Sequence, residues 1–476
     1  MSTDDVWTHE DFELVCGLEV HVELATASKL FSPAPNRFGD DPNTNIDPVC
    51  VGLPGTLPVL NRQAVELAIR LGLALDCDIR PSVFARKNYF YPDMPKDFQI
   101  SQYELPICAE GHLELPSGHV VGIERAHLEE DTGKTTHVGG GGRIHDATYS
   151  LVDYNRSGVP LLEIVSRPDI RTPDQARAYA SELRAILLAT GVSDARMEEG
   201  SMRVDANVSV RPAGADELRT RCEIKNLNSI RSLGRAIEYE ARRHVQLYLD
   251  GEAPDQETRH WDEEGGRTHT LRSKEEAYDY RYFPDPDLPP LHPDPAWIER
   301  IAAELPPMPA ARRHRLADAA GTETGDVALV VERSLDELAL GAIEAGAEPA
   351  RVLVHATQNL SADAAGLDAR AFAELVGMET GGDLTATQAK QVLAEMVETG
   401  RGPAEIAADR GFEAMDSGDL HSIVDGIVES HPDEWQRFVD GDQKVMGFFV
   451  GQVMKATKGQ ADGKAVSARL RDLAGA

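Results

Sequence analysis

Alternating apolar and polar residues are the clearest pattern in the first part of the chain. In GLEVHVEL, residues 17–24, one face carries Leu18, Val20, Val22 and Leu24, and the other carries Glu19, His21 and Glu23. The segments MRVDANVSV and CEIKNL alternate in the same way and present Arg203, Asp205, Asn207, Ser209, Glu223 and Lys225 opposite their apolar positions. Successive side chains of a strand point to opposite faces, so each segment is predicted to be a half-buried strand. We therefore expect a largely antiparallel sheet with one buried face and one polar, open face.

Two longer segments have the three- and four-residue apolar spacing of helices that pack on a sheet. The first, TPDQARAYASELRAILLATG, begins with Thr172 as a predicted N-cap and Pro173 in the first turn, and it closes at Gly191. The second is expected to begin at Asn228 or Ser229 and to end near residue 251. An α+β fold follows from combining these helices with the strands.

Proline marks the end of the strand-rich part. The segment FPDPDLPPLHPDP, residues 283–295, repeatedly fixes φ and removes donors, so it is expected to be extended and irregular. The chain beyond it reads as helix after helix, with a Gly-Arg-Gly-Pro break within 397–407. We predict an α+β domain over 1–293, a helical domain over 294–404 and a small helical tail over 405–476. Breaks or close approaches are expected in the tail at Gly447, Gly451 and Gly459.

Acidic residues exceed basic ones throughout the chain. The 80 Asp and Glu residues against 48 Lys and Arg residues give a formal net charge of −32. Such an excess disfavours indiscriminate binding to polyanions. An acid-rich solvation shell is typical of proteins from a very salty cytoplasm, where salt screens the self-repulsion. A specific basic partner or an acidic function is the alternative.

Cysteine usage indicates the compartment. The five cysteines stand at positions 16, 50, 77, 108 and 222, and no two have a C-x-x-C spacing. Structural zinc and a disulfide scaffold are therefore disfavoured, and a reducing cytoplasm is expected. The acidic N-terminus lacks the apolar core of a signal peptide, and no run approaches the roughly 18 apolar residues that predict a membrane span.

The segment AHLEEDTGKTTH, residues 126–137, contains a Gly-Lys-Thr that resembles the end of a phosphate-binding loop. A P-loop needs a glycine five positions before Gly133, because its glycines let backbone N–H groups wrap the phosphates, but that position is Leu128. The sequence therefore argues against a P-loop. The three acids at 129–131 need either a cation or water, and for Asp131 a solvated or turn-capping role is an equal alternative.

Carboxylates and an imidazole are the candidate metal ligands. Magnesium takes oxygen ligands and is held by a few carboxylates together with substrate phosphates. One or two ions would be supplied with ligands by Glu19, His21, Glu129, Glu130 and Glu163. An ordinary wet sheet surface is the alternative for each strand.

Two segments combine bases with aromatic residues. RKNYFYPDMPKDFQISQ, residues 86–102, carries Arg86, Lys87 and Lys96 beside Tyr89, Phe90 and Tyr91. RSKEEAYDYRYFPDPDLP, residues 272–289, is a second cluster of this kind. Their bases are candidate phosphate contacts, and a packed aromatic loop with surface bases is the alternative.

A series of motifs over residues 13–290 resembles, in order, the B subunits of the aspartyl/glutamyl-tRNA amidotransferase family. The motifs are GLEVHVELATASKLFS, VGLPGTLPVLN, RKNYFYPDMPKDFQISQYE, HLEEDTGKTTH, DYNRSGVPLLEIVSRPDI, EEGSMRVDANVSVRP, EIKNLNS and EEAYDYRYFPDPDLPP. The resemblance implies a first domain that forms a cradle of the glutamine synthetase and guanidino kinase type, then a helical domain and a YqeY-like tail.

The resemblance also implies an activity. Such a subunit uses ATP and Mg²⁺ to phosphorylate the side-chain carboxylate of Asp or Glu mischarged on tRNA. Ammonia released by an amidase A subunit then attacks the acyl phosphate and gives Asn-tRNA or Gln-tRNA, and a small C subunit completes a heterotrimer. Unlike a nucleophilic hydrolase, such an enzyme needs no Ser-His-Asp set, and the sequence shows none.

Site residues follow from the resemblance motif by motif. Its metal ligands would be Glu19, His21, Glu129, Glu130 and Glu163, of which Glu19, His21 and Glu130 would also be catalytic. Its ATP and phosphate contacts would be Lys87, Arg203 and Lys274. Some members carry Cys-Pro-Val-Cys before Gly-Leu-Pro-Gly, but Asp47 replaces the first cysteine here and leaves only Cys50. We therefore predict no zinc and a buried, apolar role for Cys50.

The end of the chain is locally basic. From residue 443 to 476 four Lys and two Arg face two Asp, a net charge of +4 on an otherwise acidic chain. Contact with tRNA phosphates is expected here, and helix solubility is the alternative. Two other functions stay open on the residues alone: a free-standing metal-dependent carboxylate kinase or ligase for a small molecule, and a tRNA-binding module without catalysis.

Overall fold

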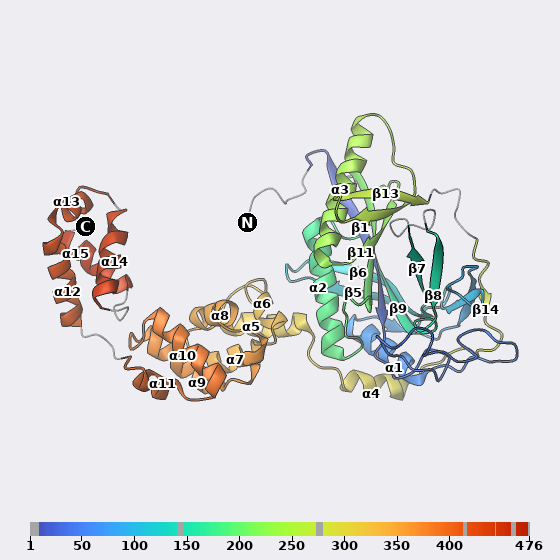
Figure 1. The fold of residues 1–476 in the computed structure, drawn as a ribbon, viewed down its shortest axis with the longest axis horizontal. Coiled ribbons are helices and arrows are strands. Elements are labelled where there is room, and N and C mark those ends of the chain that lie inside the picture. Colours follow the sequence, from blue (N-terminus) through green and yellow to red (C-terminus); the bar gives the residue numbers. More distant parts are fainter. Residues whose placement is uncertain are drawn as a thin grey trace. The chain divides into compact units, whose positions relative to one another are not determined.

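The computed structural model describes residues 9–139, 147–272, 279–412, 417–442, 444–457 and 463–474. By its internal contacts the chain divides into two units, Met1–Ala310 and Ala311–Ala476. Strands and helices share the first unit, and every described element of the second unit is helical (Figure 1). None of the described helices combines the length and apolar character that crossing a membrane requires.

A nine-stranded sheet dominates the first unit, in the order β13-β12-β11-β10-β1-β9-β6-β5-β2. Its pairs are antiparallel except for β11 with β12, which run parallel. The expected largely antiparallel sheet is therefore confirmed. The strands are β1 (Phe12–Glu23), β2 (Asp78–Ile79), β5 (Cys108–Glu114), β6 (Val120–Glu130), β9 (Pro160–Ser166), β10 (Met202–Pro212), β11 (Cys222–Leu227), β12 (Thr258–Asp262) and β13 (Arg267–Arg272).

Two smaller sheets accompany it. A three-stranded sheet has the order β14-β3-β4, and a hairpin pairs β7 with β8. Through β14 the start of the proline-rich stretch lies beside β3, which is almost 200 residues earlier in the chain. The strands are β3 (Ala85–Asn88), β4 (Phe98–Ser101), β7 (Lys134–Val138), β8 (Tyr149–Asp153) and β14 (Phe283–Pro284).

Helices cover one face of the large sheet. Figure 1 shows α2 (Pro173–Thr190) and α3 (Ile230–Leu249) along one side of the sheet, and α1 (Arg62–Ala74) packs on β2, β5 and β6. The ends of α2 are those predicted: the Thr172 hydroxyl accepts from Gln175 N, and Gly191 is left-handed with φ 67°. Ser229 caps α3, and α4 (Pro295–Ala303) completes the unit.

The two faces of the sheet differ as the alternation predicted. Beneath the helices lies one continuous core that includes Leu18, Val20, Val22, Leu128, Leu162, Ile164, Val204, Ala206 and Val208, all essentially inaccessible to solvent. Burying a side chain of this kind contributes about 1.5–3 kcal/mol, so this face fixes the register of every strand. The opposite face is free to carry polar groups that add little to stability.

The second unit is helical and holds two separate hydrophobic cores, one within residues 316–407 and one within 420–470. Its helices are α5 (Pro309–Ala320), α6 (Ala328–Glu332), α7 (Asp336–Glu344), α8 (Pro349–Gln358), η4 (Ala362–Gly366), α9 (Ala369–Thr380), α10 (Ala386–Thr399), α11 (Pro403–Asp409), α12 (Ser417–Ser430), α13 (Pro432–Val439), α14 (Val445–Ala456) and α15 (Gly463–Ala474). Helix α5 begins two residues before the boundary between the units.

The expectation for the tail glycines is wrong at two positions. Gly447 and Gly451 lie inside the continuous helix α14, and open space surrounds the position that a side chain would take at each. Neither breaks the helix or permits a close approach, because the buried Val445, Phe449 and Val453 supply enough packing to hold the helix together. Gly459 lies outside the described residues.

Candidate active site

One row of polar side chains crosses four neighbouring strands on the open face of the sheet. Arg203 of β10 stands opposite His21 of β1, His21 opposite Glu163 of β9, and Glu163 opposite His127 of β6. Two residues further along β6, Glu129 points to the same face because side chains alternate. The strand register, set by the apolar face, therefore brings together residues that are distant in sequence.

Three of the predicted residues converge. Each of His21, Glu129 and Glu163 offers one ligand atom, and these atoms all lie within 4.8 Å of one another. His21 Nδ1 is 3.4 Å from Glu129 Oε1. A fourth residue, His127, bridges the two carboxylates, with Nε2 3.3 Å from Glu163 Oε2 and 3.8 Å from Glu129 Oε2. We call these four residues the histidine–carboxylate cluster.

The charges of this cluster are strongly coupled. Burial opposes charge on His127, but Glu163 and Glu129 outweigh it and raise the pKa of His127 to about 9. Burial likewise opposes charge on His21, yet contact with Glu129 raises its pKa. In turn the two histidines hold the pKa of Glu129 well below its usual range against the effect of burial, and His127 lowers that of Glu163. The two carboxylates and the two imidazoles therefore favour one another's charged forms.

The cluster fits a divalent cation. Burial leaves His127 Nδ1 without a hydrogen bond among the described residues, which is costly for a polar atom shielded from water. Two converging carboxylates and an adjacent imidazole are donors that a hard or borderline cation accepts. A cation would supply the positive charge that protonated histidines now provide to Glu129 and Glu163.

Glu19 lies on the same face beside the cluster. Its Oε1 accepts a hydrogen bond of 2.9 Å from Asn207 Nδ2, and its register partner on β10 is Asp205. Burial, together with the charges of Glu163 and Glu223, raises the pKa of Glu19. The sheet thus brings Glu19 next to the converging residues but not into their group.

Beyond Glu19, a lysine links two acids of neighbouring strands. Lys225 Nζ is 2.7 Å from Asp205 Oδ2 and 2.8 Å from Glu223 Oε1. Despite burial, these two carboxylates raise the pKa of Lys225, so its charge is secure at neutral pH. A secure positive charge therefore lies beside Glu19 on the polar face.

The three consecutive acids of the 126–137 segment have three different partners. Glu129 meets the histidines, whereas Glu130 Oε1 pairs with Lys96 Nζ and accepts from Ile100 N at 3.0 Å. Asp131 is buried and accepts 2.8 Å from Arg203 Nη1, with Arg156 Nε 3.4 Å away. The alternative of a solvated Asp131 is therefore wrong: a guanidinium pair compensates its burial. Glu130 lies apart from His21, Glu129 and Glu163.

The predicted phosphate contacts are dispersed. Lys87 on β3 holds its Nζ 4.7 Å from the ring centroid of Tyr280. Arg203 is partly exposed but is already paired with Asp131, and its Nη1 is 3.9 Å from Glu23. Lys274 lies outside the described residues. Only Arg203 shares the row of the histidine–carboxylate cluster.

Sequence reasoning missed His127 as a site residue, and it named Lys96 only as a candidate phosphate contact and not as the partner of Glu130. His127 precedes Glu129 by two positions, so the strand period that placed Glu19 beside His21 would also have placed His127 on the polar face. The pairing of Lys96 with Glu130 carried no comparable signal, because the two residues are 34 positions apart in the sequence. Pairings of this kind depend on the three-dimensional arrangement.

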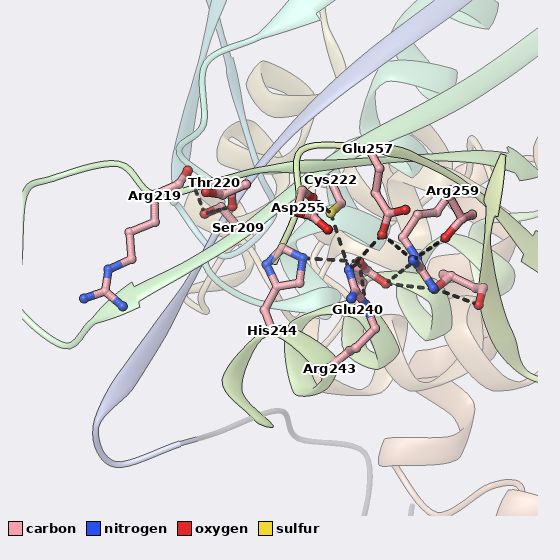
Figure 2. Close-up of polar contacts among 12 residues, drawn as sticks. Ser209, Arg219, Thr220, Cys222, Glu240, Arg243, His244, Asp255, Glu257 and Arg259 are labelled. Carbon is pink, nitrogen blue, oxygen red and sulfur yellow. Dashed lines mark hydrogen bonds and ion pairs between the residues drawn. The ribbon is translucent and has the colours of Figure 1, made fainter. Parts of the chain in front are cut away.

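A second group also meets the distance requirement for metal ligands: Cys222 of β11 with Glu240 and His244 of α3. Figure 2 shows this group with Arg243 and Arg259 beside Glu240. We call these five residues the guanidinium cluster. Glu240 Oε1 is 2.6 Å from Arg243 Nη2, and its Oε2 accepts 2.8 Å from Thr268 Oγ1. Its carboxylate is thus already compensated.

Cys50 is buried, as expected, but its surroundings are polar. Its Sγ lies 3.3 Å from Ser32 Oγ, and Asp47 Oδ1 accepts from Cys50 N at 2.9 Å. Burial raises the pKa of the Cys50 thiol, so the sulfur stays protonated and unreactive at neutral pH. The five cysteines are all free and buried.

Sequence families match most of the chain. The profile of the GatB/GatE catalytic domain matches residues 14–299, and a profile described as GatB domain matches residues 353–473. The first match includes the whole histidine–carboxylate cluster, and the second lies in the helical unit.

Individual relatives match over nearly their full length. The B subunit of the aspartyl/glutamyl-tRNA(Asn/Gln) amidotransferase of Moorella thermoacetica is 46% identical over 97% of this chain and 99% of its own. The protein of the same name from Frankia casuarinae is 49% identical, over 98% and 96% of the two chains. That of Salinispora arenicola is 48% identical, over 98% and 97%.

Proposed function

The chain belongs to the family of aspartyl/glutamyl-tRNA(Asn/Gln) amidotransferase B subunits, and on that premise we propose that its open sheet face activates a carboxylate with ATP. The substrate would be the side chain of Asp or Glu mischarged on tRNA(Asn) or tRNA(Gln). One observation carries the proposal: His21, Glu129 and Glu163 converge on the open face of the sheet although they lie far apart in sequence. The cradle of the glutamine synthetase type is part of the same proposal.

The chemistry requires two transfers. A carboxylate oxygen of the substrate attacks the γ-phosphorus of ATP, ADP leaves, and an acyl phosphate forms. Ammonia then attacks the carbonyl carbon, inorganic phosphate leaves, and the amide remains after one proton is lost. Phosphoryl transfer depends mainly on positioning and electrostatics, which is the help that fixed charges on a rigid sheet give.

Residues of this chain would divide the work. Glu129 and Glu163, with His21, would hold Mg²⁺, which when bound neutralises phosphate charge. His127 fixes the two carboxylates, and Lys87 and Arg203 are proposed to meet the phosphates, with Lys274 a further candidate. Glu19, whose pKa is raised, is the proposed acceptor of the proton that ammonia loses. Glu130 stays a predicted catalytic residue and metal ligand, and releasing it would require its pair with Lys96 to open.

Other predictions also remain proposals. Three separate hydrophobic cores support a division into three domains, but the first core reaches Ile301 and the second reaches Ala407, past the proposed boundaries at 293 and 404. An amidase A subunit would supply ammonia from glutamine, and a small C subunit would complete the complex. A reducing cytoplasm agrees with the five free cysteines. The acid-rich surface agrees with a salty cytoplasm. No zinc is assigned to the chain.

Assay of the assembled complex tests the function. The chain is co-purified with an A and a C subunit and given glutamine, ATP and Mg²⁺ with Asp-tRNA(Asn) or Glu-tRNA(Gln). We expect amidation of at least one mischarged tRNA, with one ATP consumed for each amide. ATP turnover on a free small carboxylate without any tRNA would favour the free-standing ligase instead. No ATP turnover with either tRNA would refute the proposal.

The tail is the proposed tRNA contact. Three exposed bases surround a core formed by Phe449 and its neighbours: Lys444 directly precedes α14, Lys455 lies on α14 and Arg471 lies on α15. Truncation after residue 404 is expected to abolish transfer to tRNA and to leave the first unit folded. Unchanged transfer by the truncated chain in the complex would contradict this role.

A further inference from the structure

The last four residues of β6, residues 127–130, run past the end of β5. β5 begins at Cys108, which pairs with Ala126, whereas β9 accompanies β6 as far as Glu130. This part of β6 is buried, and buried backbone groups need hydrogen-bond partners. On the side that β5 leaves, those partners come from residues 99–102, of which β4 contains the first three.

Two glutamines supply the backbone partners. Gln99 Nε2 donates to Glu130 O at 2.8 Å, and Gln102 Oε1 accepts from Leu128 N at 2.9 Å. Because a backbone N–H can only donate, this contact fixes which way the Gln102 amide points. Its Nε2 is buried and has no hydrogen-bond partner in the part of the chain that the structure describes, which costs stability. The segment is therefore held against β6 at a cost, which points to a function for its position.

Ser101 lies between these glutamines and contacts the histidine–carboxylate cluster. Its Oγ donates to Glu129 Oε2 at 3.4 Å, and both side chains are almost fully buried. The other oxygen, Glu129 Oε1, faces His21 Nδ1 at 3.4 Å. Because the two oxygens have different neighbours, the hydroxyl restricts rotation of the carboxylate and keeps Oε1 directed toward the converging ligand atoms.

The Ser101 hydroxyl differs from the histidines in its response to a metal ion. A bound metal ion displaces protons from histidine, and the positive charge that His21 and His127 offer Glu129 goes with them. A hydroxyl is a neutral donor and keeps its proton. Carboxylates that hold a metal are oriented by hydrogen bonds from neighbouring groups, and losing such a group costs about 10- to 100-fold in metal affinity. Ser101 is thus a donor that would remain for Glu129 in the metal-bound state.

We infer that Ser101 is a positioning residue, which holds the carboxylate of Glu129 in the orientation that a divalent cation needs. This inference rests on the proposed function, because that function assigns the cation to the histidine–carboxylate cluster. It adds β4, a strand of the three-stranded sheet, to the elements that shape the site.

Mn²⁺ titrations of the three-subunit complex test the inference, with free Mn²⁺ followed by electron paramagnetic resonance. An acid-rich surface attracts cations as well, so the specific site is defined as the binding that Glu129→Gln removes. Ser101→Ala should weaken this site about tenfold, the lower end of the range for a supporting group, because its hydrogen bond is long. Ser101→Thr keeps the hydroxyl and should bind within about threefold of the wild type.

Ser209→Ala is the matched control. Ser209 is a buried serine of β10, and its Oγ lies 3.2 Å and 2.9 Å from the carbonyl oxygens of Arg219 and Thr220. Both alanine variants lose a buried hydroxyl and its hydrogen bonding, so their melting temperatures should fall by similar amounts. Only Ser101→Ala should lose Mn²⁺ affinity, and Ser209→Ala should bind as the wild type does.

Amidation rates separate positioning from general damage. Ser101→Ala should need about tenfold more Mg²⁺ for its half-maximal rate but approach the wild-type rate at saturating Mg²⁺, with KM for mischarged tRNA within about twofold. Unchanged Mn²⁺ affinity in Ser101→Ala, or an equal loss in Ser209→Ala, would overturn the inference and leave the proposed function intact. If the wild type and Glu129→Gln bind Mn²⁺ alike, the metal site of the proposed function fails, and this inference fails with it.

Discussion

Two groups of side chains in the first unit have the same ligand spacing but different neighbours. The histidine–carboxylate cluster lies on the open face of the sheet, and the guanidinium cluster lies between β11 and α3 (Figure 2). In each, three potential ligand atoms lie within 4.8 Å of one another. Distance alone would rank them as equal metal sites.

The cations beside the carboxylates separate them. Glu240 is compensated by Arg243, and Arg259 Nε stands 3.4 Å from its second oxygen. A guanidinium keeps its charge at any accessible pH, so a dication at this place would meet permanent repulsion. Cys222 adds to this, because burial raises its pKa to about 12 and keeps the thiol protonated.

The carboxylates of the other cluster meet imidazoles instead. His21 and His127 carry charge only while protonated, and a bound metal ion can displace a histidine's proton into solvent. The comparison teaches that a cluster can accept a metal ion when the positive charge beside its carboxylates is a histidine's proton, which can leave, and not the permanent charge of a guanidinium. Stability would then be the role of the guanidinium cluster and chemistry that of the other.

The largest expected effect is on catalysis. Glu129→Gln in the three-subunit complex should lower the rate of Asn-tRNA formation roughly 10²–10³-fold, because it removes charge where phosphoryl transfer would need a metal. Rates are measured at saturating ATP, Mg²⁺ and mischarged tRNA. Glu240→Gln is the matched control and should retain most of the rate per folded molecule. Equal losses in the two variants would remove the distinction between the clusters.

The next effect is on stability and runs the other way. Glu240 has no exposed side-chain surface, and its pKa is lowered to about 2: burial opposes this, but His244 and Arg243 outweigh it. Glu240→Gln should therefore cost about 3 kcal/mol of unfolding free energy for the first unit at pH 7, because it leaves two guanidiniums with one partner fewer. Urea denaturation of the isolated chain measures it. A loss below about 1 kcal/mol would show that Arg243 finds solvent instead.

Part of this contrast was readable in the sequence. Alternation in GLEVHVEL and MRVDANVSV predicted the sheet and its polar face because strand period is a local property, and helix α2 was predictable from Thr172 and Gly191 for the same reason. The ligand chemistry of carboxylates and the family motifs, rather than periodicity, pointed to Glu129 and Glu163. The pattern on its own left a wet surface as the alternative.

The remainder depended on which strands become neighbours. β1 lies between β9 and β10, so His21 meets Glu163 and Arg203, and no local signal specifies that order. For the same reason the sequence could not separate Glu129 from Glu130, which point to opposite faces of β6 and have different partners. The guanidinium cluster was not predicted at all, because its arginines look like ordinary helix and strand cations.

A smaller effect concerns metal affinity. With Mn²⁺ as the probe, Glu163→Gln should weaken binding at least about tenfold, because loss of a ligand exceeds the effect of replacing a supporting group. His244→Asn is the control from the guanidinium cluster and should bind as the wild type does. Electron paramagnetic resonance of free Mn²⁺ gives both affinities. Weaker binding in His244→Asn, with Glu163→Gln unaffected, would reverse the assignment of the two clusters.

The smallest effect is the pH dependence of the stability difference between wild type and Glu240→Gln. A carboxyl whose folded pKa is depressed contributes stability that is complete above its ordinary value, here 4.5, and is lost as pH falls toward about 2. The difference should thus be constant from pH 7 to about 5 and should then shrink by at most about 1.4 kcal/mol per pH unit, the equivalent of one proton. Denaturation series at pH 7, 5, 4 and 3.5 resolve this, with Glu238→Gln, a half-buried acid of the same helix, as control. A difference that stays constant down to pH 3.5 would mean that Glu240 contributes through packing and neutral hydrogen bonds, and the guanidinium cluster would then lose its claim to be an ionic support.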